Sequence, residues 1–367
     1  MFIWQRPEWP NFLWDDSKLL RPLSEARLLQ GQLLGRMAML GFDLKQEAQL
    51  AALTEDAVKS SEIEGELLPR NSVRSSLARR LGLPDAAATE ADRRTEGVVE
   101  MLLDATQNFT KPLTRERLFG WQAALFPTGY SGISKIAVGR WRGDADGPMQ
   151  VVSGPIGRQK VHFKAAPAVA VDVEIERFLA WFNGPSHAEG LLRAGLAHLW
   201  FVTIHPFDDG NGRIARAIAD LALAKTEGQG LRFYSLSAQI RRQRAGYYDI
   251  LERTQRGGLD VTDWLAWFLD CFSRAIDGSD EQVGQVLHKA RFWRDNADAT
   301  FNERQRLVLN RVLDGFEGKL TAKKWSILAK VSIPTAQRDI NDLIDRGVLI
   351  RNPGGSKNTS YDIGVAQ

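Results

Sequence analysis

The chain has 367 residues, 44% of them hydrophobic and 25% charged, which is ordinary for a soluble globular protein of two or three domains. Its formal net charge of +3 is too small for its length to predict nucleic-acid or membrane binding by electrostatics alone. The single cysteine, Cys271, excludes internal disulfides, and the sequence has neither a secretory leader nor a bilayer-length apolar run, so we expect a cytoplasmic protein without a membrane partner.

The first ninety-two residues predict a helical region. Residues 1–15 carry three tryptophans and two prolines, and we expect an extended aromatic arm that packs on the rest of the chain. Apolar spacing predicts helices over residues 16–40 and 44–66, the second ending near Gly65. Residues 71–92 are expected to form a loop or a short helix.

The next segment predicts helices over residues 91–103, 114–125 and 170–182. Between the last two, residues 149–163 form two short β-prone runs around a Gly/Pro turn that includes Gly154 and Pro155. This pattern predicts a β-hairpin.

The most informative stretch is residues 205–216, His-Pro-Phe-Asp-Asp-Gly-Asn-Gly-Arg-Ile-Ala-Arg. A helix that is apolar on nearly every side is predicted to precede it, and a second helix to begin at about Asn211. Gly210 and Gly212 permit backbone angles that can turn successive N–H groups toward one point at the second helix's N-terminus. Such a point attracts an anion.

The charged residues of this stretch fit a bound phosphate chain. Arg213 and Arg216 are three residues apart, so they share a helix face and could hold phosphate oxygens bidentately. Asp209 suits a hard divalent cation that bridges phosphates. His205 is the only group of the stretch that can take a proton near neutral pH. Together they predict a di- or triphosphate, a magnesium ion and a general base.

The stretch resembles the signature of the Fic family, H-P-F-x-[D/E]-G-N-G-R-x-x-R, at every fixed position. That family transfers a nucleotide monophosphate, usually AMP from ATP, to a side-chain hydroxyl of a protein. The resemblance implies that His205 deprotonates the target hydroxyl, Asp209 holds Mg²⁺, and the amides of Gly210, Asn211 and Gly212 bind phosphate. Arg213 would neutralise the transferring and leaving phosphates, Arg216 would reach the γ-phosphate, and Phe207 would anchor the loop in the core.

A second stretch, Ser60-Ser61-Glu62-Ile63-Glu64-Gly65-Glu66, lies at the end of a predicted helix. It resembles the inhibitory motif [S/T]-x-x-x-E-[G/N] that precedes the catalytic core in one class of Fic proteins. The resemblance implies that Ser60, Glu64 and Gly65 are regulatory, with Glu64 pairing with Arg216 and blocking the γ-phosphate. An arginine held by a carboxylate cannot also clamp a phosphate.

The resemblance carries two weaker expectations. The 149–163 hairpin would be the family's flap, which aligns a target peptide by main-chain pairing. Residues 247–255 resemble the segment beside the adenine, where Tyr248 and Gln255 are the candidate contacts, although aromatics at helical spacing are as readily core. An apolar helix over residues 262–275 would close the core.

The last part begins with the polar residues 277–280 and a charged helix reaching Asp295. Three helical patterns, a strand, a Gly-rich turn and a second strand follow from residue 301, an order that resembles a winged helix. Thr335, Gln337, Arg338 and Asn341 could face a DNA groove, and Arg351 and Lys357 could contact its backbone. Because Asp339, Asp342 and Asp345 would repel phosphates, we favour protein docking or dimer formation over DNA binding.

The sequence therefore predicts a mainly α protein: an N-terminal region (1–92) with the inhibitory motif, a Fic core (93–276) with a hairpin flap, a linker helix (277–300) and a winged helix-turn-helix domain (301–367). The leading hypothesis is an autoinhibited protein adenylyltransferase that modifies a Ser, Thr or Tyr hydroxyl of a target and of itself. A DNA-binding regulator with the Fic site as a nucleotide sensor, and an enzyme that removes AMP, are the alternatives. The sequence does not disclose the target, the preferred nucleotide or the oligomeric state.

Overall fold

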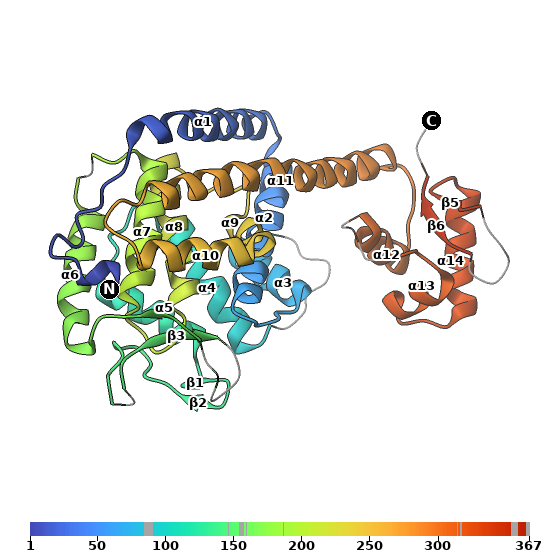
Figure 1. The fold of residues 1–367 in the computed structure, drawn as a ribbon. Helices are drawn as coiled ribbons and strands as arrows, with labels where there is room; N and C mark the ends of the chain where they lie inside the picture. The colour runs from blue at the N-terminus through green and yellow to red at the C-terminus, as the bar shows by residue number, and fades with distance from the viewer. Residues whose placement is uncertain are drawn as a thin grey trace. The chain divides into compact units, whose positions relative to one another are not determined.

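The structure is a computed structural model that describes residues 1–83, 91–145, 147–153, 158, 160–185, 187–313, 315, 318–353 and 359–364, without the side chains of residues 280–282. The chain divides into two units, Met1–Asp280 and Glu281–Gln367. Both are mainly helical with small β-hairpins, which confirms the predicted fold class at this level (Figure 1).

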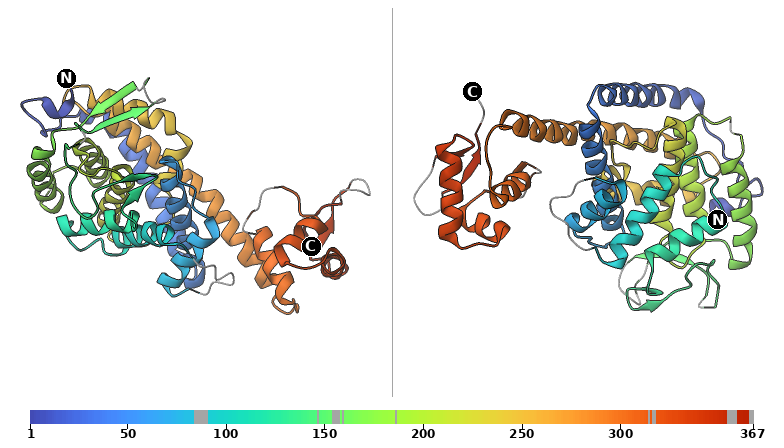
Figure 2. Two further views of the ribbon diagram at one scale, coloured as in Figure 1. Left: turned by 90° about the horizontal axis from the view of Figure 1, so that it is seen from below. Right: turned by 180° about the vertical axis from the view of Figure 1, so that it is seen from behind.

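The first unit is built around two adjoining helices that bracket residues 205–210. Every residue of α7 from Ala194 to Ile204 is buried, as its apolar sequence predicted, and α8 packs along it (Figures 1 and 2). The elements of this unit are η1 (Ile3–Gln5), α1 (Asp16–Ala38), α2 (Phe42–Ile63), α3 (Arg70–Leu81), α4 (Arg93–Gln107), α5 (Arg115–Leu125), β1 (Tyr130–Ser131), β2 (Ser134–Lys135), β3 (Gln150–Ser153), β4 (Lys160–Lys164), α6 (Ala168–Asn183), α7 (Gly190–Ile204), α8 (Asn211–Glu227), α9 (Leu236–Arg242) and α10 (Arg244–Gln255).

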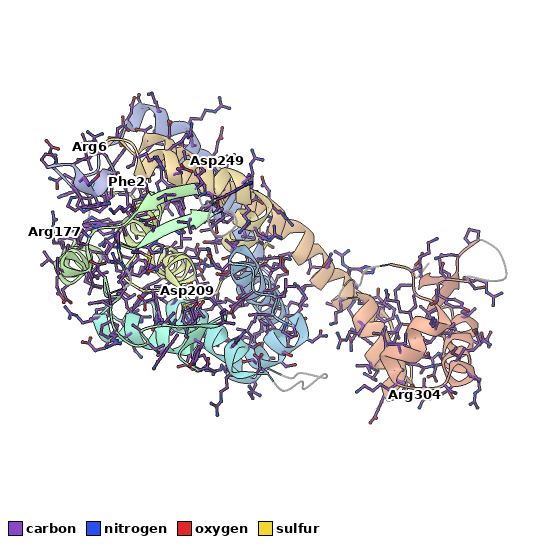
Figure 3. The ribbon with its side chains drawn as sticks, turned by 60° about the horizontal axis from the view of Figure 1, so that its bottom comes forward. Phe2, Arg6, Arg177, Asp209, Asp249 and Arg304 are labelled. Carbon is purple, nitrogen blue, oxygen red and sulfur yellow. The ribbon has the colours of Figure 1, made fainter. Side chains whose placement is uncertain are left out.

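The N-terminal region is part of the same compact unit. Helix α2 packs against α3, α4, α8 and α9, which brings its C-terminal end to the start of α8. The aromatic arm packs as expected: Trp9 is 6% exposed and meets Trp200 of α7 edge-on, with ring centroids 6.2 Å apart. Phe2 contacts Phe163 of β4 in the same geometry and lies beside the hairpin in Figure 3.

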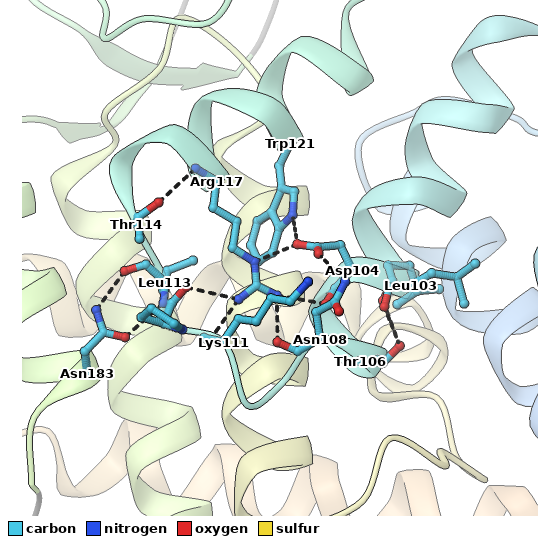
Figure 4. Close-up of polar contacts among 12 residues, drawn as sticks. Leu103, Asp104, Thr106, Asn108, Lys111, Leu113, Thr114, Arg117, Trp121 and Asn183 are labelled. Atoms are coloured by element: carbon cyan, nitrogen blue, oxygen red, sulfur yellow. Dashed lines mark hydrogen bonds and ion pairs between the residues drawn. The ribbon is translucent and has the colours of Figure 1, made fainter.

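A partly buried polar cluster fixes the turn between α4 and α5 (Figure 4). The Asp104 carboxylate accepts hydrogen bonds from Arg117 Nε at 2.6 Å and from Trp121 Nε1 at 2.7 Å. Asn183 of α6 exchanges two hydrogen bonds with the backbone of Leu113. These bonds satisfy polar groups that burial would otherwise penalise, and they hold α5 beside the functional loop.

The sequence predicted two separate helices, one over residues 262–275 and a charged one after the polar residues 277–280, and this prediction is wrong. A single helix, α11, runs from Thr262 to Asp295 and crosses the boundary between the units. Gly278 inside a helix costs only about 1 kcal/mol relative to alanine. The Ser279 hydroxyl donates to the carbonyl of Ile276 within the helix, so neither residue ends it. For residues 71–92 the sequence predicted a loop or a short helix, and residues 71–81 belong to helix α3 (Arg70–Leu81), while residues 84–90 lie outside the described residues. Helix α9 was not predicted.

The second unit comprises the end of α11, α12 (Glu303–Leu313), α13 (Ala322–Ala329), α14 (Ile333–Asp345), β5 (Leu349–Arg351) and β6 (Tyr361–Ile363). This is the helix-helix-helix-strand-strand order that the sequence predicted, and β5 pairs antiparallel with β6. Its core is formed by Phe292, Val308, Leu309, Trp325, Ile340 and Leu343, among others. Lys357 lies outside the described residues. In the described part of the chain, no helix has the length and apolarity needed to cross a membrane.

Candidate functional site

The loop between α7 and α8 is held in an unusual backbone conformation. His205, the residue after α7, is left-handed (φ 53°, ψ 60°), which is rare for a residue with a side chain. Arg142 fixes this turn: its Nε donates to the His205 carbonyl at 2.7 Å, and its backbone N–H donates to Pro206. The conformation is therefore maintained by a buried arginine 63 residues upstream.

Asn211 locks the rest of the loop. Its Oδ1 accepts from the Phe207 N–H at 3.0 Å and its Nδ2 donates to the Phe207 carbonyl at 2.8 Å, while the Phe207 ring is fully buried. Phe207 thus anchors the loop, as the resemblance implied. The Asn211 side chain is occupied within the protein, so a phosphate would meet its backbone amide rather than its side chain.

Helix α8 begins with an N-terminus suited to an anion. Gly210 occupies the N-cap position with φ 89°, and in the described part of the chain no side chain caps the helix. The first-turn N–H groups of a helix lack partners within it, so a phosphate could accept from them. Of the predicted cradle, the Asn211 and Gly212 amides lie in this first turn, whereas the Gly210 N–H donates to Asp209 Oδ1.

The His205 imidazole is arranged as a base. Its Nδ1 lies 3.1 Å from the Val202 carbonyl oxygen, which can only accept, so Nδ1 carries the proton and Nε2 keeps its lone pair. Burial lowers the pKa of His205 to about 4; the Val202 carbonyl opposes this shift and the charge of Arg142 adds to it. The ring is therefore neutral across the physiological range.

Arg213 and Arg216 of α8 are each paired with a carboxylate that lies just after the end of α2. Arg216 is 1% exposed; its Nη2 lies 2.8 Å from Glu64 Oε1, and its Nε donates to Ser60 Oγ at 2.9 Å. Arg213 Nη1 donates to Glu66 Oε2 at 2.5 Å. The predicted contact between Glu64 and Arg216 is thus present, and the contact of Glu66 was not predicted.

Glu64 also lies against the phosphate cradle itself. A Cβ atom added to Gly212 would stand 2.2 Å from Glu64 Oε1 and 3.4 Å from Arg216 Nη1. The carboxylate thus occupies space directly over the first turn of α8, where an anion would bind. Gly65, which follows Glu64 with φ 87°, lets the chain leave α2 at this point. Arg244 donates to the carbonyl of Ile63 and secures the same helix end.

A cavity of about 810 Å³ opens beside the loop, large enough for a nucleotide. Its lining includes Glu64, His205, Asp209, Gly212, Tyr248 and Gln255. The structure therefore brings Tyr248 and Gln255 to the same cavity as the loop. The Gln255 amide donates to Thr203 Oγ1 at 3.2 Å, and the Tyr248 ring lies 5.0 Å from the Arg244 guanidinium.

Asp209 is the residue that could hold a metal ion. Its Oδ1 accepts from the Gly210 N–H at 2.5 Å, and its other oxygen contacts the Ser131 hydroxyl. Among the described residues, no three His, Cys, Asp or Glu side chains converge to hold an ion. One carboxylate beside a phosphate cradle fits Mg²⁺, which takes few protein ligands and completes its octahedron with phosphate and water.

Strands β3 and β4 form the predicted hairpin and border the cavity, with a register shift between Val151 and Val152. The turn expected at residues 154–157 lies outside the described residues. Several contacts attach β4 to α10 and its C-cap residue. Among them, His162 Nδ1 lies 2.5 Å from Glu252 Oε2, and Arg256 Nη2 donates to the Val161 carbonyl at 2.7 Å. Neither contact has a sequence signal, since each joins segments about ninety residues apart.

Two segments of the chain match models of known protein domains. Residues 112–223 match the model of the Fic/DOC family, so this segment, which includes the loop, is a Fic/DOC domain. Residues 2–83, which include Ser60, Glu64 and Glu66, match a domain of unknown function, DUF4172.

The relatives are distant. The chain is 30% identical over 105 residues to a protein named Protein adenylyltransferase Fic from Drosophila ananassae, and 31% identical over 107 residues to that of Drosophila willistoni. These matches cover 28% and 29% of this chain and 20% of each relative. The chain thus spans about a fifth of the length of these curated relatives.

Solved structures support the fold over most of the chain. A Fic family protein from Desulfovibrio desulfuricans aligns with a TM-score of 0.53 at 20% identity, covering 95% of this chain and 97% of that one. A Fic domain containing signaling protein from Bacteroides thetaiotaomicron aligns with a TM-score of 0.50 at 18% identity, covering 73% and 98%. At such identities the likeness extends to the fold alone.

Proposed function

We propose that this protein is a nucleotidyltransferase that moves AMP from ATP to a Ser, Thr or Tyr hydroxyl of a target protein, and that Glu64 holds it in an inhibited state. The observation that carries the proposal is the position of Glu64. Its carboxylate lies 2.8 Å from Arg216 and over the helix N-terminus at Gly212, while the neutral His205 lines the same cavity. A negative group already sits where the substrate's phosphates would bind.

In the proposed reaction, the target hydroxyl loses its proton to His205 Nε2 as its oxygen bonds to the α-phosphorus of ATP. The bond from that phosphorus to the bridging oxygen breaks, and pyrophosphate leaves. The first-turn amides of α8 and the guanidinium of Arg213 would stabilise the charge that develops on the phosphates. The fixed backbone of His205, held by Arg142, supplies the orientation that such catalysis requires.

A magnesium ion would neutralise charge on the phosphates, and Asp209 is the residue that would hold it. On the other side of the cavity, strand β3 offers exposed residues such as Val152 to a target segment. An extended peptide that pairs with the hairpin would bring its hydroxyl toward the cavity. The proposal therefore divides the site into a phosphate side and a target side.

The test is self-labelling with ATP that carries radiolabel on the α-phosphate, in the presence of Mg²⁺. We expect Glu64→Gly to raise labelling about tenfold or more, which corresponds to an inhibitory contact of about 1.4 kcal/mol. Glu62→Gly is the matched control. Glu62 lies two residues earlier and pairs with Lys59 and Arg241, away from the cradle. Its substitution should leave labelling unchanged.

Three outcomes separate this function from its alternatives. Labelling that persists when His205→Ala is added to Glu64→Gly would overturn the assignment of the base. No labelling of any variant, together with tight ATP binding, would favour a nucleotide sensor. Release of AMP from a previously labelled chain by the native protein, but not by Glu64→Gly, would favour removal of AMP, since Glu64 lines the cavity where it could orient a water.

A further inference from the structure

On sequence alone, three acidic residues of α14 count against DNA binding because they would repel phosphates. In the structure, the first of them, Asp339, does not face solvent. Asp339 is 5% exposed. Its Oδ2 accepts from Arg304 Nε at 2.9 Å, and its Oδ1 accepts from Arg304 Nη2 and from Asn302 at 3.0 and 3.1 Å. Arg304 belongs to α12, so this carboxylate faces the interior of the unit and its charge is paired there.

Asp342 is also engaged on the side of α12. Its Oδ2 accepts from Gln305 Nε2 at 2.7 Å and from Arg346 Nη1 at 3.3 Å. Only Asp345 remains, and it is the last residue of α14. At 1.5 Å of rise per residue, it stands about 10 Å along the axis from Arg338. The N-terminal half of α14 therefore presents no unpaired acid.

The side chains that this half does present are polar and basic. Arg338 and Asn341 are exposed on the helix face away from Ala336, Ile340 and Leu343, and the half-buried Thr335 and Gln337 flank that face. Gln337 Nε2 donates to Asn341 Oδ1 at 2.9 Å, which orders two amides side by side. Amide and guanidinium groups match the edges of adenine and guanine in a DNA major groove.

Basic residues occur on the neighbouring elements of the same unit. Lys323 of α13, Lys330 after α13 and Arg351 of β5 are all exposed. Residues 281–367 contain fourteen Lys or Arg and ten Asp or Glu, whereas residues 1–280 contain thirty-four and thirty-five. The positive excess of the chain thus lies in this unit, as a surface for phosphates requires.

We propose that residues 281–367 bind double-stranded DNA, with the N-terminal half of α14 in the major groove, where Gln337, Arg338 and Asn341 contact base edges. Lys323 and Arg351 contact the phosphate backbone and contribute affinity without sequence choice. The major groove of B-form DNA, about 12 Å wide, admits a helix, whereas the major groove of A-form RNA is too narrow for side chains to read. The ligand is therefore duplex DNA rather than duplex RNA.

The experiment measures binding of the full-length protein to a fluorescent 30-base-pair duplex of mixed sequence by anisotropy, from about 50 to 200 mM NaCl. We expect binding that weakens steeply with salt. Arg338→Glu should reduce affinity at least about tenfold. Lys323→Ala should reduce the slope of log affinity against log salt by about 0.9. Arg21→Glu, the same charge change at an exposed residue of α1 that pairs with Glu25, should leave binding unchanged.

Selection from a randomised duplex library measures sequence choice. The native protein should enrich a defined site, and Asn341→Ala should bind it with relaxed choice at one position. An unfolding midpoint of Arg338→Glu equal to that of the native protein would show that the substitution leaves the fold intact. Unaltered self-labelling by Arg338→Glu separates this proposal from the enzymatic one. The proposal is overturned by salt-independent or undetectable binding at 50 mM NaCl, by equal binding of duplex RNA, or by equal losses in Arg338→Glu and Arg21→Glu.

Discussion

Two segments border one cavity but differ in how far they are buried. They are residues 205–216, which comprise the loop and the start of α8, and the hairpin of β3 and β4. The loop is buried and internally bonded: Phe207 is fully buried, and Asn211 and Arg216 are 2% and 1% exposed. The hairpin leaves Val152 and Val161 40% and 38% exposed, and side-chain contacts attach it to α10. In the proposed function, the phosphate side would thus be preorganised, whereas the exposed edge of the hairpin would pair with the target.

The largest loss of activity is expected when the general base on the phosphate side of the site is removed. In the Glu64→Gly background, we expect His205→Ala to lower kcat/KM for labelling about 10³-fold, the usual contribution of general base catalysis. The pH profile sharpens the assignment. Burial lowers the pKa of His205 to about 4, so the base is neutral above that value and protonates only below it. The kcat/KM of Glu64→Gly should therefore be level from pH 6 to 8 and fall below about pH 5.

The control for that profile is the stability of the protein, followed by circular dichroism over the same pH range. An inflection near 6.5 with an intact fold would contradict the assigned environment of His205, since 6.5 is the ordinary pKa of an exposed imidazole.

A smaller effect tests whether both arginines of the loop are restrained. Glu66 holds Arg213 as Glu64 holds Arg216, and the two carboxylate side chains are similarly exposed, at 32% and 28%. Only Glu64 also lies against Gly212 in the first turn of α8, so Glu66 contributes the ion pair alone. Water screens a pair of this kind, so its net strength is about 0.6 kcal/mol, or roughly threefold. We expect Glu66→Gln, added to Glu64→Gly, to raise self-labelling by about that factor. Glu62→Gln in the same background is the control, and labelling that stays level or falls would show that Glu66 does not restrain the site.

The sequence predicted the loop well because its chemistry is contiguous. The buried helix, the turn and the second helix each have a local signal: α7 ends at Ile204, directly before the stretch, and α8 begins at Asn211, as predicted. Arg142 was missed because a single arginine in a Gly-rich stretch gives no sign that it will bind the carbonyl of a residue 63 positions later. Contacts of that separation depend on how helices pack.

Two other misses had usable signals. Glu66 lies two residues after Glu64 in the same acidic stretch, and this spacing is a local signal for its contact with Arg213. Asp339 is three residues after Ala336 and four before Leu343, both buried, so helical spacing places it on the inner face of α14. Judged by charge alone, it counted against DNA binding; judged by periodicity, it belongs to the core.

The smallest kinetic effect is expected from a substitution on the target side of the site, in the hairpin of β3 and β4. His162→Ala removes the contact with Glu252 that helps attach β4 to α10, and this contact is partly exposed to solvent. The substitution is added to the Glu64→Gly enzyme, and the His205→Ala chain is the acceptor. Relative to Glu64→Gly alone, we expect KM for the acceptor to rise about twofold and kcat to stay constant. A contact that aligns the acceptor equally before and during the reaction contributes only uniform binding. Lys164→Gln on the same strand is the control. A fall in kcat instead of a rise in KM would place the hairpin on the phosphate side of the site, because only interactions formed in the transition state change kcat.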